Sequence, residues 1–191
     1  MKLLTALALT LLLVPWAVAQ HNTFTLDSDS SSVRMTLNTT REVVNGTFRV
    51  QACSIEFEPN SSAMSGAVTV LAGSGKTGND TRDKKMTKSI LQAGQYTTVS
   101  FAPKAYSGTI PQYASSTIEV TGTFTLLDKP HDMTIPMQIV VDRSKATAKA
   151  HFVVPYVQWG LKNPSFLFWK AENDVVIDLS LVGQISYATT H

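Results

Sequence analysis

The sequence predicts an all-β fold, an antiparallel β-barrel of roughly eight strands with one short helix. Through most of the chain after residue 22, apolar residues alternate with polar ones, the period of strands with one face turned inward. Turn-forming residues separate these runs at hairpin-like spacing. A single sheet of so many strands would be too wide to stay open, and closing it removes its edges.

The clearest predicted strands lie in the second half of the chain, at 118–126, 133–142, 146–156 and 175–185. Earlier strands are predicted at 23–27, 33–37, 46–58, 64–72 and 97–106. Within 46–58 the apolar phase slips by one residue, which predicts a bulge or bend near Ala52. Turns are expected at 58–62, 127–131 and 142–145, which places His131 in a turn.

One segment, 79–92, breaks the strand rhythm and is predicted to form a helix of about three turns. Asp80 or Thr81 is expected to cap its N-terminus. Its apolar residues fall at helical spacing: Met86, Ile90 and Leu91. Three lysines are expected on its solvent-facing side: Lys84, Lys85 and Lys88.

The N-terminal residues MKLLTALALTLLLVPWAVAQ resemble a secretory signal peptide, predicted to span 1–19 with cleavage between Ala19 and Gln20. The apolar run is shorter than the about 20 residues that a transmembrane helix needs. Residues 20–191 are then expected to form one exported barrel domain. Cys53 is the only cysteine, so the domain is expected to rely on its core and not on disulfides.

Composition and motifs argue against several function classes. The net charge of +2 gives the chain no electrostatic reason to bind nucleic acid. The four histidines are scattered, without zinc-ligand spacing, and His151 falls on the outward phase of its strand. No Gly-x-Ser-x-Gly motif is present, and residues 73–77 are interpreted as a glycine-rich turn. No catalytic residue, metal site or cofactor is predicted.

Small residues at inward positions raise the question of a cavity. They occur on several strands: Ala52, Gly66, Ala72, Gly122, Ala146, Ala148 and Ala150. A barrel of this size is either filled by side chains or wide enough for one small ligand, and both alternatives stay open. A continuous apolar cavity would suit a hydrocarbon chain, because apolar burial alone stabilises such a ligand. The predicted lining residues are Phe48, Val70, Phe101, Phe124, Ile139, Ala148, Phe152 and Tyr156, with Trp159 near the mouth.

Six aromatic residues are concentrated between Phe152 and Lys170. Phe152 and Tyr156 continue an inward strand phase, and the chain after Gly160 is expected to connect to the last strand. Phe166, Phe168 and Trp169 are predicted to close one end of the barrel. Membrane docking is a second role considered for this connection, with the helix lysines steering toward anionic head groups.

Short motifs in a fixed order resemble the YceI-like family over about residues 22–187. They are Phe24-x-Leu26-Asp27, Gly46-Thr47-Phe48, Ile55-x-Phe57, Thr77-Gly78-Asn79, Val99-Ser100-Phe101, Gly122-Thr123-Phe124-Thr125-Leu126, Trp159-Gly160-Leu161-Lys162-Asn163-Pro164-Ser165 and Asp174-Val175-Val176-Ile177-Asp178-Leu179. The resemblance implies an extended, lipocalin-like barrel of eight strands that encloses a polyisoprenoid, such as a polyprenyl-quinone, or a fatty amide. It also implies a periplasmic or secreted location and no enzymatic activity.

The resemblance further suggests transient contact with the membrane or with a membrane b-type cytochrome, and a homodimer is left open. The expected partner is therefore a hydrophobic small molecule. The alternative is a stress-induced envelope protein whose barrel is packed solid and whose surface binds a partner, without a lipid cargo.

Overall fold

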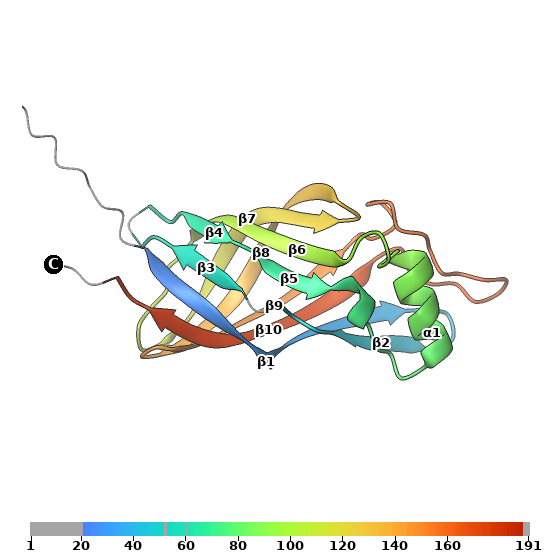
Figure 1. Ribbon diagram of the computed structural model, residues 1–191, viewed down its shortest axis with the longest axis horizontal. Coiled ribbons are helices and arrows are strands. Elements are labelled where there is room, and N and C mark those ends of the chain that lie inside the picture. Colours follow the sequence, from blue (N-terminus) through green and yellow to red (C-terminus); the bar gives the residue numbers. More distant parts are fainter. Residues whose placement is uncertain (1–20, 52, 60, 189–191) are drawn as a thin grey trace, which may run out of the picture.

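The computed structural model describes residues 21–51, 53–59 and 61–188 (Figure 1). The predicted signal peptide lies outside the described residues. The described chain forms ten strands: β1 (Asn22–Asn38), β2 (Val43–Phe48), β3 (Ser54–Phe57), β4 (Met64–Gly66), β5 (Val68–Leu71), β6 (Thr98–Ser107), β7 (Ser115–Leu126), β8 (Lys129–Asp142), β9 (Lys145–Val154) and β10 (Val175–Ser186). Helical turns separate β5 from β6: a 3₁₀ turn (Ala72–Ser74), α1 (Asp80–Lys85) and a π-helical turn (Met86–Ile90).

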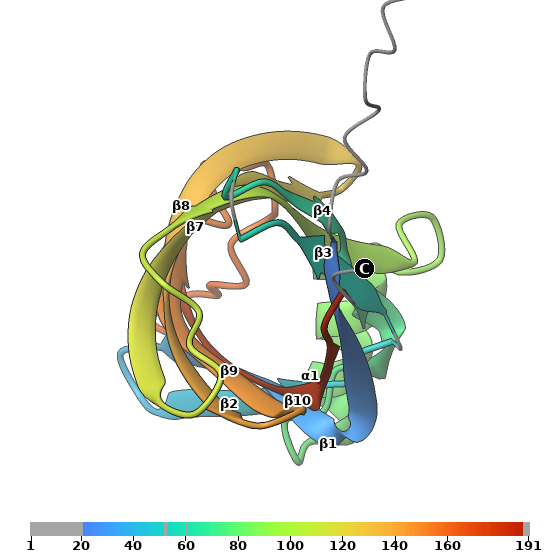
Figure 2. The same cartoon turned by 90° about the vertical axis from the view of Figure 1, so that its left-hand side faces the viewer.

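The strands form one antiparallel sheet in the order β4-β3-β1-β10-β9-β8-β7-β6-β5, with β2 also paired to β1. Viewed from one end, the sheet curls into a ring (Figure 2). Ala63, just before β4, bridges to Ala105 of β6 and so brings the two ends of the sheet together. The prediction of an all-β antiparallel barrel with one short helix is confirmed, and the barrel is nearly closed.

Strand β1 merges two of the predicted strands. It pairs with β10 along both halves, and its register shifts between Asp27 and Ser32. At this irregularity the Asp27 carboxylate accepts hydrogen bonds from the backbone N–H of Asp29 (3.1 Å) and from the Ser30 hydroxyl (2.7 Å). A bulge of this kind lets one long strand change direction while it keeps its apolar face inward.

Two other predicted strands are each divided. The run 46–58 becomes β2, which pairs with the second half of β1, and β3, which pairs with the first half. Between them Val50 bridges to Val70 of β5. A bulge or bend was predicted near Ala52, and Ala52 itself lies outside the described residues. The run 64–72 is interrupted at Gly66, which has φ of 97°. The nine predicted runs thus give ten strands, because two of them merge into β1 and two are each divided.

The predicted helix begins as α1 and continues as the π-helical turn. Its N-cap is Asn79, and not Asp80 or Thr81, because the Asn79 side chain accepts a hydrogen bond from the Arg82 backbone N–H at 3.0 Å. The predicted position of the lysines on the solvent-facing side is confirmed, since all three are exposed. Figure 1 shows α1 at the end of the barrel that also carries the connection between β9 and β10.

Candidate functional site

The barrel encloses an elongated apolar cavity of about 230 Å³. Its wall includes residues near both barrel ends, from Phe24, Ile110 and Ile185 to Leu91 and Leu161. Of the 34 described residues that line it, only three have polar side chains: Ser100, Thr147 and Tyr156. No charged side chain is among these lining residues. Such an interior can hold hydrocarbon but offers nothing to offset the cost of burying a charged group.

Tyr156 is the one lining residue with a titratable side chain, and its hydroxyl is already engaged. The hydroxyl donates a hydrogen bond to the Glu172 backbone carbonyl at 2.6 Å. Burial, with a smaller contribution from the negative charge of Asp174, raises the pKa of Tyr156 to about 12. The residue therefore stays neutral, and its hydrogen bond joins the start of the β9–β10 connection to the end of that connection.

The structure brings eight of the nine predicted residues together in the cavity wall. They are Phe48, Val70, Phe101, Phe124, Ile139, Ala148, Phe152 and Tyr156. Trp159 does not reach the wall. Its ring lies 5.4 Å from that of Phe124, centroid to centroid, so it packs behind a lining residue. Direct ligand contact by any of the nine stays a prediction.

The alanines of β9 leave room in the barrel. Ala148 pairs with Ile139 on one side and with Leu181 on the other, and all three line the cavity. Ala146 in the same strand also lines it. A methyl group between longer neighbours leaves a gap that no other side chain fills.

Gly122 and Gly183 do not have this effect, because backbone carbonyls and aromatic rings of the neighbouring strands occupy the space of a side chain. A Cβ added to Gly122 would lie 2.7 Å from Cζ of Phe101, and one added to Gly183 would lie 2.8 Å from Cζ of Phe24. Small residues in the sequence therefore divide into those that create the cavity and those that allow a neighbouring ring to pack.

The end of the cavity near α1 is covered by different residues from those predicted. Phe166 and Phe168 were expected to close it, but their side chains are 67% and 94% exposed. Buried Tyr156 and Leu161, with partly buried Leu91, line the cavity at this end instead. The expectation was wrong for Phe166 and Phe168, because the chain turns out into solvent there, whereas the residues just after β9 fold over the barrel end. Trp169, the third residue predicted at this end, is partly buried and donates its indole N–H to the Thr39 hydroxyl.

His131 was predicted to lie in a turn, but the structure places it in β8. Leu127 and Asp128 both have positive φ, 52° and 55°, and form a two-residue hairpin turn, so β8 begins at Lys129 and includes His131. His131 shares the inward phase of Ile135, and its imidazole Nε2 is buried without a hydrogen-bond partner in the described structure. Extending the alternation backwards from Met133 would have placed it correctly.

Other reactive or charged groups lie outside the cavity wall. His151 is on the outer face, as predicted, with its Nδ1 2.7 Å from an Asp178 carboxylate oxygen. Burial raises the pKa of the Cys53 thiol, which lowers its reactivity. Over 21–51, 53–59 and 61–188, no group of three or more His, Cys, Asp or Glu side chains could hold a metal ion. None of the helices in these ranges has the length and apolar character needed to cross a membrane.

Comparison with known families agrees with the earlier resemblance. The family model of the YceI-like domain matches residues 24–183. The chain belongs to the YceI-like family. The match runs from the third residue of β1 to most of β10 and covers every strand between them, so family membership applies to the whole barrel. No curated protein matches the chain.

Solved structures share the YceI-like barrel at low sequence identity. BcnA of Burkholderia cenocepacia superposes with a TM-score of 0.67 at 18% identity, covering 83% of this chain and 99% of that one. A polyisoprenoid-binding domain from Saccharophagus degradans gives 0.66 at 11% identity, with 85% and 98% covered. The YceI protein of Campylobacter jejuni gives 0.54 at 14% identity, with 94% and 92% covered. These likenesses establish the fold.

Proposed function

We propose that the protein is a non-enzymatic binding or carrier protein that encloses a long-chain amphiphile in its barrel. The observation that carries the proposal is the apolar cavity, which extends along the barrel and has no charged side chain in its described lining. A polyisoprenoid, for example the tail of a polyprenyl-quinone, is the proposed ligand class. The polyisoprenoid-binding description of the Saccharophagus degradans neighbour supports this choice.

The size of the cavity favours one slender chain over a bulky ring system. Its volume of about 230 Å³ exceeds the roughly 150 Å³ of an engineered cavity that binds benzene, but is less than the roughly 300–1,000 Å³ of sites for drug-sized ligands. Contact with 34 residues at this volume means a long and narrow shape. Each buried CH₂ contributes about 0.8 kcal/mol, so a hydrocarbon chain needs no polar contact to bind.

The absence of enzymatic activity, of cofactors and of metals is part of the same proposal. The one titratable side chain in the described wall, Tyr156, has a pKa of about 12 and a hydroxyl that is already hydrogen-bonded. A general acid or base works best with a pKa near the operating pH, so Tyr156 is poorly suited to that role. This supports binding over catalysis.

The proposed location is the periplasm or the cell exterior, on the basis of the signal peptide predicted at 1–19. Contact with a membrane b-type cytochrome stays a prediction from the family resemblance, and a homodimer stays open.

Solvent extraction of the gently purified protein, followed by mass spectrometry, tests the proposed function. A lipid recovered in stoichiometric amount is the expected result. Repeated absence of lipid, together with no uptake of an added polyprenyl-quinone or fatty amide, would contradict the carrier. That result would favour the alternative, an envelope protein with a packed barrel and a binding surface. Uptake of one added class and not the other would identify the preferred head group.

A further inference from the structure

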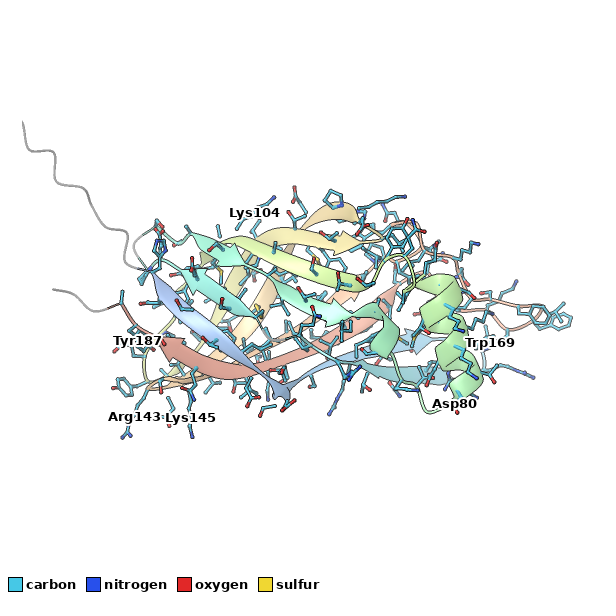
Figure 3. All side chains as sticks on the ribbon, viewed as in Figure 1. Asp80, Lys104, Arg143, Lys145, Trp169 and Tyr187 are labelled. Carbon is cyan, nitrogen blue, oxygen red and sulfur yellow. The ribbon has the colours of Figure 1, made fainter. Side chains whose placement is uncertain are left out.

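The connection between β9 and β10 carries an apolar hairpin that projects from the barrel. Phe166 and Trp169 exchange two backbone hydrogen bonds, each of 2.9 Å, around a turn made of Leu167 and Phe168. The side chains of Phe166, Leu167 and Phe168 are 67%, 69% and 94% exposed. Figure 1 shows this connection extending beyond α1 along the long axis, and Figure 3 shows Trp169 at the same end. We call residues 166–169 the apolar hairpin.

The base of the apolar hairpin is fastened to the barrel by polar contacts. The Trp169 indole N–H donates to the Thr39 hydroxyl at 3.0 Å. The Thr40 backbone N–H donates to the Lys170 carbonyl at 2.9 Å, and the Lys170 N–H donates to the Thr40 hydroxyl at 3.1 Å. The fold therefore holds large apolar side chains in solvent at a defined position, although burying them would stabilise the chain.

Exposed lysines lie close to the apolar hairpin in the chain and on the helical segment that contacts the same connection. Lys162 and Lys170 flank it and are exposed, and Lys85 of α1 donates from Nζ to the Pro164 carbonyl at 3.2 Å. Lys84 and Lys88 are exposed on the same helical segment. Several acidic groups also lie at this end. Glu42 pairs with Arg82, and Asp80 and Asp83 pair with Lys76. The Glu172 carboxylate accepts a hydrogen bond from the Asn38 side chain, and Asp174 lies near Tyr156.

We propose that the apolar hairpin docks the protein on an anionic lipid bilayer, with Leu167 and Phe168 inserted at the interface. An aromatic and aliphatic tip with lysines behind it matches the layers of a bilayer, in which apolar chains lie beneath anionic head groups. A convex two-residue turn is a poor protein interface, since specific interfaces bury about 800 Å² on each partner. The occupant argued for here is therefore a lipid surface.

Docking at this end would bring the cavity to a source of ligand. Leu161 and Tyr156, which line the cavity, belong to the same connection as the apolar hairpin, and Leu91 follows the π-helical turn beside it. This advantage rests on the proposed lipid-binding function. The docking itself depends only on the apolar hairpin and its lysines, so it is measured separately from ligand content.

Co-sedimentation of the purified protein with vesicles tests docking. Vesicles of phosphatidylcholine alone are compared with vesicles that also contain phosphatidylglycerol. The wild type is expected to prefer the anionic vesicles, and a Leu167→Ser/Phe168→Ser variant is expected to lose binding at least about tenfold. Lys162→Gln/Lys170→Gln is expected to weaken binding to the anionic vesicles only. The matched control is Tyr113→Ser, which removes a side chain that is 71% exposed on the β6–β7 loop.

Several results would overturn the docking proposal. They are equal binding by the Leu167→Ser/Phe168→Ser variant and the wild type, an equal loss in Tyr113→Ser, or absence of wild-type binding to pure lipid vesicles. Binding to native membranes but not to lipid vesicles would indicate a protein partner instead. A changed elution volume for the apolar-hairpin variant without vesicles would indicate contact between two copies.

Ligand uptake separates this proposal from the proposed function. Uptake of polyprenyl-quinone added in solution should remain intact in the Leu167→Ser/Phe168→Ser variant, because neither residue lines the cavity. If neither the wild type nor the variant takes up the quinone while the wild type still binds vesicles, the carrier proposal fails and the docking proposal stands. If the wild type takes up the quinone but does not bind vesicles, the docking proposal fails and the carrier proposal stands.

Discussion

The indole ring of Trp159 stacks on the imidazole ring of His131, with ring centroids 4.2 Å apart and planes inclined by 7°. This contact joins the β9–β10 connection to β8. The pairing between β8 and β9 ends at Met137 and Ala150, although β8 itself begins at Lys129. The stacked pair therefore bridges a part of the barrel where these two strands have separated, directly behind the lining residue Phe124.

Replacing Trp159 by Ala is expected to lower the free energy of unfolding by about 2–3 kcal/mol, less than for a fully buried aromatic. His131→Ala should cost less, because its Nε2 has no hydrogen-bond partner to lose in the described structure. A double-mutant cycle measured by urea unfolding should give a coupling of about 0.5–1.5 kcal/mol between the two rings. Strictly additive effects would show that the stack contributes no stability of its own.

Ala148→Phe is expected to block the cavity, because a ring would occupy the space between Ile139 and Leu181. The amount of lipid recovered by solvent extraction should fall to a small fraction of the wild-type amount. Overpacking should cost about 1–3 kcal/mol of stability, measured by urea unfolding.

A matched control for this variant is Val140→Phe, which adds a ring to the outer face of the neighbouring strand, where Val140 is exposed. It should leave both stability and lipid content close to wild type. Unchanged lipid content in Ala148→Phe would mean that a ligand, if present, does not pass this point of the barrel.

Acid sensitivity should depend on Asp83. Its carboxylate accepts hydrogen bonds from the Thr77 hydroxyl (2.6 Å) and backbone N–H (2.8 Å) and lies 3.7 Å from Lys76 Nζ, so its pKa is below the usual 3.8. The folded state then binds protons less readily than the unfolded state, so the charged Asp83 carboxylate stabilises the fold. This stabilisation is present above pH 3.8 and is lost as the pH falls through the lower folded pKa. Asp83→Asn should therefore be less stable than wild type at neutral pH, with the difference shrinking in acid.

Urea unfolding at several pH values measures this effect. Asp80→Asn is the control, because Asp80 is 89% exposed and its only ion pair in the described structure is a 4.0 Å contact with Lys76. It should change stability little at any pH. A difference between wild type and Asp83→Asn that stayed constant with pH would contradict the role assigned to the Asp83 charge.

Tyr156→Phe should lower the free energy of unfolding by about 0.5–1.5 kcal/mol, because it removes the hydrogen bond to the Glu172 carbonyl. The folded pKa of about 12 is above the usual 10.0, so this group's contribution is present below pH 10.0 and lost as the pH rises through 12. An alkaline absorbance titration should lose its last phenolate step in Tyr156→Phe and keep it in Tyr113→Phe. An unchanged titration in Tyr156→Phe would contradict the assignment.

Much of the barrel and of its wall could be predicted from apolar alternation. The phase that places Phe124, Ile139 and Ala148 inward depends only on the period of a strand, and all three line the cavity. The division of the run 46–58 into two strands was not predictable, because it depends on pairing of β2 and β3 with separate halves of β1. The position of Trp159 relative to the wall could not be predicted from a period, because it lies outside the regular strands; the structure places its ring against the lining residue Phe124.

By itself, the sequence determined the strand phases, the one helical segment and the apolar character of the interior, because each depends on local spacing and residue type. Only the tertiary structure decided which small residues leave space. Gly122 is filled by Phe101 from the neighbouring strand, whereas Ala148 faces neighbours that leave a gap. It also decided that Phe168 faces solvent and Leu161 faces the cavity, since that choice depends on contacts between the connection and distant residues such as Thr39 and Thr40.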